Sequence, residues 1–81
     1  MRRTGFGDAF SLEREALGMQ VKLCRVKAGL TQEALARRVG RRHSYVSRIE
    51  SAGQMVDVFL LVELLRAMDV EPIDFLERLV F

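Results

Sequence analysis

Apolar residues recur every three or four positions through most of the chain, in segments separated by short polar breaks. This spacing places the apolar side chains on one face of an α-helix. No segment alternates between apolar and polar residues for long enough to predict a strand. The breaks are marked by Gly29, Gly40, Gly53 and Pro72. The pattern therefore predicts an all-α fold of five helices.

The first predicted helix covers residues 12–28 and ends before Gly29, which can adopt the positive φ of a helix C-terminal cap. We expect Cys24 to be buried in the core rather than to have a redox role, because it lies on the apolar stripe of this helix. The stripe consists of Leu17, Val21, Cys24 and Ala28.

Residues that favour helix ends locate the other four helices. Thr31 is a suitable N-cap for a second helix over residues 32–39. A third helix is expected from residue 42 or 43 to residue 51. Asp57 is a suitable N-cap for the fourth helix, and Pro72 suits the first position of the fifth.

The connection between the second and third predicted helices is very short, because only Gly40 and Arg41 separate them. Such a turn favours a sharp crossing of the two helices over a side-by-side antiparallel arrangement. Gly40 can supply the positive φ that a tight turn needs, and the small side chain of Ala36 lets the helices approach closely. Apolar contact between the two helices is expected from Leu35, Val39, Val46 and Ile49.

The third predicted helix has an apolar inner face and a polar outer face without acidic residues. On a helical wheel, Val46 and Ile49 face inward, with Glu50 beside them. Small polar side chains let a helix approach a surface closely, while arginine reaches further, so this outer face fits the major groove of DNA. The outer face and its flanks contain His43, Ser44, Tyr45, Ser47, Arg48 and Ser51.

Charge is divided unevenly along the 81 residues, although the whole chain carries a net charge of only +2. Residues 1–48 contain eleven basic and four acidic side chains, whereas residues 49–81 contain two basic and seven acidic ones. This division indicates one face made for a polyanion and another face turned away from it. A solvated basic surface without a ligand is the alternative reading of the same charges.

The remaining composition argues against several other functions. Cys24 is the only cysteine, which excludes an intramolecular disulfide framework and fits a reducing compartment. The chain has neither a signal-peptide pattern nor an apolar run that could span a membrane, so we expect a cytoplasmic protein without a membrane partner. His43 lacks companion metal ligands, and Ser44 and Ser47 lack a His–Asp pair that could activate them. We expect no enzyme activity, no metal and no cofactor.

A resemblance to a known family rests on Arg25, "GLTQEALA" at 29–36, Gly40 and "SYVSRIE" at 44–50. These residues and their spacing resemble the helix-turn-helix of the Cro and phage-repressor (XRE-type) family. The segment "LLVELLRAMDVEPIDFL" at 60–76 also looks like the last two helices of that family. The resemblance implies a compact five-helix, lambda-repressor-like DNA-binding domain with the helix-turn-helix at helices 2 and 3. It implies sequence-specific binding to double-stranded DNA as a transcriptional regulator, expected to be a repressor.

The resemblance also implies roles for individual residues. Gln32 matches a position that contacts backbone phosphate, and Arg25 and Glu50 match a pair that joins helix 1 to helix 3. Arg42 departs from the family, because it replaces the usual Ser or Thr N-cap of helix 3. The full set of expected DNA-binding residues is Gln32, Arg42, His43, Ser44, Tyr45, Ser47 and Arg48.

The domain division predicted from the sequence is a flexible arm over residues 1–10 and a helix-turn-helix domain over residues 11–81. Val58, Phe59 and Val62 widen the apolar face of the fourth helix beyond what a core stripe requires. We therefore expect a homodimer formed through helices 4 and 5. The alternative is an antitoxin-type or other protein-interaction module, in which the same apolar surface binds a different, toxin-like protein.

Overall fold

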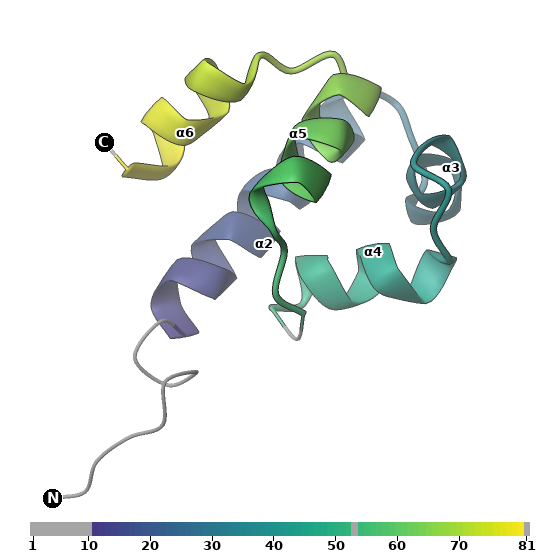
Figure 1. Ribbon diagram of the computed structural model, residues 1–81, viewed down its shortest axis with the longest axis horizontal. Coiled ribbons are helices and arrows are strands. Elements are labelled where there is room, and N and C mark those ends of the chain that lie inside the picture. Colours follow the sequence, from purple (N-terminus) through teal and green to yellow (C-terminus); the bar gives the residue numbers. More distant parts are fainter. Residues whose placement is uncertain (1–10, 53, 81) are drawn as a thin grey trace, which may run out of the picture.

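The computed structural model describes residues 11–52 and 54–80 of the chain. Within these residues the secondary structure consists of five α-helices and no strand, as the sequence predicted (Figure 1). The predicted arm at residues 1–10 and the predicted break at Gly53 lie outside the described residues. The helices are α2 (Ser11–Lys27), α3 (Gln32–Arg38), α4 (His43–Glu50), α5 (Val58–Ala67) and α6 (Pro72–Val80).

Two helix starts are capped as the local sequence predicts. The Thr31 side chain accepts a hydrogen bond of 3.0 Å from the backbone N–H of Ala34, which satisfies one of the free donors in the first turn of α3. The Asp57 carboxylate accepts an equivalent bond of 2.8 Å from the N–H of Leu60 at the start of α5. Arg42 occupies the N-cap position of α4 and makes no side-chain cap.

The core lies where α2, α3, α4 and α5 converge, and α6 closes it through Phe75. α3 packs against α4, α4 also contacts α2, and α6 contacts both α2 and α5 (Figure 1). Cys24 is buried, as predicted. The core residues are Val21, Cys24, Leu35, Ala36, Val46, Ile49, Leu60, Leu64, Leu65, Met68 and Phe75.

One predicted core position is wrong. Ala28 is exposed, although it continues the spacing of the buried Val21 and Cys24. It follows the last residue of α2 and lines an open depression together with Lys27 and Ala67. A helical wheel gives the direction of a side chain but does not show whether another element covers that end of the helix, and here none does.

Gly18 is a buried position that the sequence pattern did not predict. A Cβ atom added to Gly18 would lie 2.5 Å from the carbonyl oxygen of Ile49 and 2.8 Å from that of Glu50. Carbon and oxygen atoms cannot approach so closely without displacing the backbone. The absence of a side chain at Gly18 therefore lets α2 lie directly against the C-terminal end of α4.

Candidate nucleic-acid interface

The turn between α3 and α4 fixes the angle at which α4 leaves the body of the protein. Gly40 has φ of +69°, as predicted, and the N–H of Arg41 donates a hydrogen bond of 2.8 Å to the carbonyl of Ala36. Beneath the turn, Val46 is fully buried and Ile49 is 1% exposed. α4 is therefore anchored along one face, and it lies at the edge of the fold (Figure 1).

The predicted DNA-binding residues of α4 differ in how far they are exposed. Ser47 and Tyr45 are partly buried, and Tyr45 packs against the core. The guanidinium of Arg41 lies 5.2 Å from the centre of the Tyr45 ring, a cation–π distance that keeps this arginine beside the helix. The exposed members of the predicted set are Arg42, His43, Ser44 and Arg48.

A shallow depression of about 320 Å³ lies at the N-terminal half of α4. Three guanidinium-bearing residues line it, and no acidic residue does. The first-turn N–H groups of α4 lie at the same end, and the positive end of the helix dipole favours anions there. Its lining residues are Gly40, Arg41, Arg42, Ser44, Tyr45 and Arg48.

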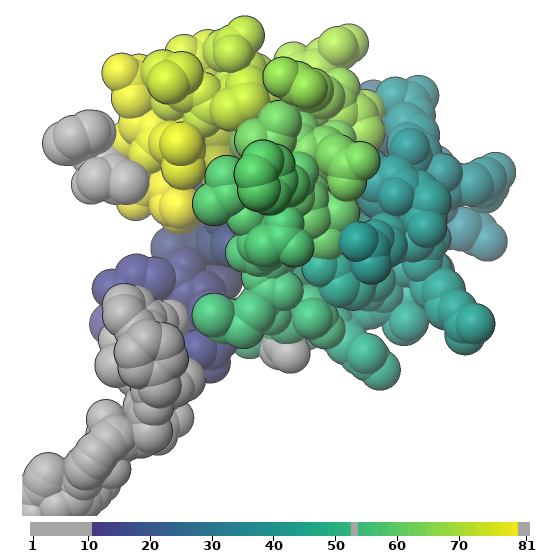
Figure 2. All heavy atoms as spheres, in the orientation of Figure 1, coloured from purple at the N-terminus to yellow at the C-terminus, as the bar shows by residue number. Residues whose placement is uncertain are grey.

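The other cations of this region have different surroundings. Arg37 and Arg38 are both exposed near the end of α3. Arg38 donates a hydrogen bond of 2.9 Å from Nη1 to the carbonyl of Ala67 at the end of α5, so it links two helices. Figure 2 shows the side chains of α3 and α4, in teal, projecting from one side of the molecule away from α6, in yellow.

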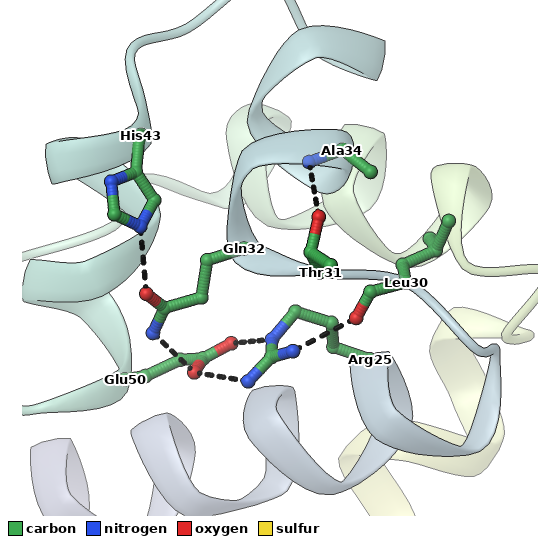
Figure 3. Close-up of polar contacts among 7 residues, drawn as sticks. All are labelled: Arg25, Leu30, Thr31, Gln32, Ala34, His43 and Glu50. Atoms are coloured by element: carbon green, nitrogen blue, oxygen red, sulfur yellow. Dashed lines mark hydrogen bonds and ion pairs between the residues drawn. The ribbon is translucent and has the colours of Figure 1, made fainter.

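An ion pair joins α2 to α4, as predicted. Arg25 Nε lies 2.6 Å from Glu50 Oε2, and Arg25 Nη2 lies 3.1 Å from Glu50 Oε1 (Figure 3). The side chains are 12% and 4% exposed, respectively. Arg25 also donates from Nη1 to the carbonyl of Leu30, at 2.8 Å, so the same guanidinium secures the loop before α3.

Gln32 and His43 extend this ion pair to the start of α4. Gln32 Nε2 donates to Glu50 Oε1 at 2.9 Å, and Gln32 Oε1 lies 2.9 Å from His43 Nε2 (Figure 3). The sequence predicted Gln32 only as a phosphate contact and did not predict its contacts with Glu50 and His43. No periodicity signals such contacts, because they join residues 18 and 11 positions apart.

The described residues contain no cluster of three or more His, Cys, Asp or Glu side chains that could hold a metal ion. Within the same residues, no helix is both long and apolar enough to cross a membrane.

Comparison with known proteins gives a consistent result. The model of the helix-turn-helix domain family matches residues 16–79. The restriction-modification controller protein C.Esp1396I superposes with a TM-score of 0.80 and 26% identity, over 86% of this chain and 92% of that chain. The same protein, as a tetramer in complex with its natural 35 base-pair operator, gives a TM-score of 0.79 and 26% identity, with 86% and 92% covered. The clp gene regulator ClgR from C. glutamicum gives a TM-score of 0.78 and 28% identity, with 83% and 86% covered.

No curated protein matches the chain significantly. The family match covers most of the chain, and its span includes the crossed α3 and α4. The predicted all-α fold and the predicted helix-turn-helix regulator family are confirmed. By this match the protein belongs to the helix-turn-helix domain family.

Proposed function

We propose that this protein is a transcriptional regulator that binds double-stranded DNA sequence-specifically, with α4 in the major groove. One observation carries the proposal: α4 is anchored by buried Val46 and Ile49 while its exposed face presents serine, histidine and arginine without an acid. DNA binding also fits the neighbours, because C.Esp1396I is bound to its operator and ClgR is a gene regulator. These relatives are regulators rather than enzymes, and the proposed function requires no catalytic group.

Phosphate contacts would position the protein on the duplex. Arg42 is exposed at the N-cap of α4, beside N–H groups that favour an anion. Gln32 uses one amide hydrogen for Glu50, and its second amide hydrogen stays available for a phosphate oxygen. These contacts supply affinity that depends on salt but not on base sequence.

Base reading would come mainly from Arg48. This residue is exposed on the face opposite Val46, and the small Ser44 clears its approach. A guanidinium can bond to O6 and N7 of guanine together, and only guanine offers that pair of acceptors in the major groove. We expect at least one G·C pair per half-site to be read by Arg48.

Selection of bound sequences from a random DNA pool, followed by binding to single base-pair variants at two salt concentrations, tests these roles. Arg48→Ala should lose about 1–3 kcal/mol per half-site and relax the preference at one G·C pair. Arg42→Ala should weaken all sequences about equally and reduce the salt dependence. If Arg48→Ala weakens every sequence uniformly and Arg42→Ala abolishes the guanine preference, the assigned roles are reversed. If the unmodified protein selects no sequence from the pool, the proposed function itself is refuted.

A homodimer through α5 and α6 is the second part of the proposal. Phe59 is 84% exposed and Val58 is 70% exposed on α5, and Ile73 is 62% exposed on α6. Apolar side chains exposed to this degree, away from the basic face of α4, fit a partner surface. A two-fold dimer would place two copies of α4 about 34 Å apart, one turn of DNA, on a nearly palindromic site.

Sedimentation of the protein alone and on DNA tests this assembly. Phe59→Lys should produce monomers and weaken binding to a two-half-site operator, while Leu23→Lys, which places the same cation at an exposed apolar position of α2, outside the proposed surface, serves as the control. Monomeric behaviour of the unmodified protein in both conditions would refute the dimer. Tight binding of a toxin-like protein at the same surface would support the antitoxin-type alternative. A cytoplasmic location, where the DNA is accessible, is part of the same proposal.

A further inference from the structure

The hydrogen bonds from Arg25 to His43 form one chain in which the direction of each bond is determined. The order is Arg25, Glu50, Gln32 and His43, and His43 is the first residue of the exposed helix α4 (Figure 3). An ionised carboxylate accepts hydrogen bonds and has none to donate. Glu50 is ion-paired with Arg25, so the group that faces Glu50 from Gln32 is the amide NH₂.

The orientation of Gln32 determines which nitrogen of His43 carries the proton. Because the NH₂ of Gln32 is directed at Glu50, its carbonyl oxygen faces His43 Nε2 at 2.9 Å. A carbonyl oxygen only accepts hydrogen bonds, so His43 Nε2 must be the donor. A neutral imidazole has a single N–H, and the proton on Nε2 leaves Nδ1 as a bare acceptor.

Nδ1 is the nitrogen of His43 that a ligand can reach. The ring is exposed, and Figure 3 shows Nδ1 turned away from Gln32. Among the described residues, no protein group is hydrogen-bonded to this atom. The N-terminal residues of a recognition helix are the ones that contact base edges, and His43 opens α4.

We propose that His43 is a specificity-determining residue that accepts a hydrogen bond, through Nδ1, from the exocyclic amine of adenine or cytosine. Gln32 is its positioning residue, since it holds the ring in the orientation and tautomer that expose the acceptor. In the major groove only adenine N6 and cytosine N4 donate hydrogen bonds, so an acceptor selects these two bases. The inference rests on the proposed DNA binding and adds an acceptor to the donor supplied by Arg48.

The tautomer can be tested in the free protein, without DNA. Long-range ¹H–¹⁵N correlation of the neutral imidazole should show a protonated Nε2 and an unprotonated Nδ1. The Nε2–H proton should exchange with water more slowly than in the Gln32→Met variant, which keeps the side-chain length but removes the acceptor. A protonated Nδ1, or exchange unaffected by Gln32→Met, would overturn the inference.

The base preference can be tested on the selected operator by exchanging each base pair of a half-site in turn. The unmodified protein should prefer an amine-bearing base at one position by about two- to tenfold, the range expected for one neutral hydrogen bond. His43→Ala should abolish that preference. Gln32→Met should reduce it, and should add nothing to the loss of preference in a His43→Ala background.

The outcomes separate this inference from the proposed function. Sequence-selective binding in which His43→Ala changes no base preference would overturn the inference and leave the proposed function standing. If Gln32→Met weakens binding to all sequences equally, both in the unmodified protein and in the His43→Ala variant, Gln32 contacts phosphate alone. That result would overturn its positioning role. Absence of any selective binding would refute both proposals.

Discussion

Substitution of Gly18 by alanine is expected to destabilise the protein, although alanine favours helices more than glycine does. At an unconstrained helix interior the change would stabilise by about 1 kcal/mol. Here the new methyl carbon would lie 2.5 Å from one backbone oxygen and 2.8 Å from another, those of Ile49 and Glu50. Both atoms belong to the backbone of α4, so no side-chain rotation can relieve the contact.

The magnitude follows from the distance that the helices must move. To restore even a 3.0 Å contact, α2 and α4 must separate by about 0.5 Å, since the present distance is 2.5 Å. Overpacking of this kind typically costs about 1–3 kcal/mol. After subtraction of the gain of about 1 kcal/mol in helix propensity, we expect a net loss of up to about 2 kcal/mol in the free energy of unfolding.

Urea unfolding followed by circular dichroism measures this loss, and a domain of this size should melt about 4–8 °C lower per kcal/mol. The exposed Lys22 of the same helix provides the matched control. The difference in stability between Lys22→Ala and Lys22→Gly measures how much alanine favours α2 over glycine where no close contact interferes. If Gly18→Ala stabilises the protein as much as alanine does at Lys22, the close approach of α2 and α4 is wrong.

Three further predictions concern the turn, the ion pair and a helix cap. Gly40→Val should lower stability by about 1–3 kcal/mol in thermal unfolding through backbone strain, because φ at Gly40 is +69°. Steric contact adds nothing, since a Cβ atom at Gly40 would have no neighbour within 4 Å. An unchanged melting temperature would contradict this prediction. Arg25→Met should lower stability by about 3–5 kcal/mol, because it leaves the nearly buried Glu50 carboxylate without its cation. The additional change Glu50→Leu should recover part of this loss, and a double variant that is less stable than the single one would argue against this account. Asp57→Ala should cost about 1 kcal/mol in urea unfolding by removing the cap of α5, and Asp57→Asn should restore most of it; equal losses in the two variants would exclude a capping role.

Much of the fold and part of the site could be predicted from the sequence, because the relevant physics acts over a few residues. Apolar spacing and capping residues located the starts of all five helices to within about one residue, as the caps at Thr31 and Asp57 illustrate. The positive φ of Gly40 follows from the length of its turn. The inward direction of Val46 and Ile49 follows from the helical repeat, and it left the opposite face of α4 for the proposed ligand.

Contacts between helices required the tertiary structure, because the helical repeat fixes the direction of a side chain but not the neighbour it meets. Ala28 and Cys24 have the same predicted direction, yet only Cys24 is covered by other helices. In the sequence, Gly18 is only a glycine within a predicted helix, where glycine lowers helix stability. The position of α4 shows in addition that a side chain there would collide with the backbone of α4. The arrangement of Gln32 between Glu50 and His43 depends on how α3 lies against α4, and for that reason the inferred tautomer of His43 follows from the tertiary structure alone.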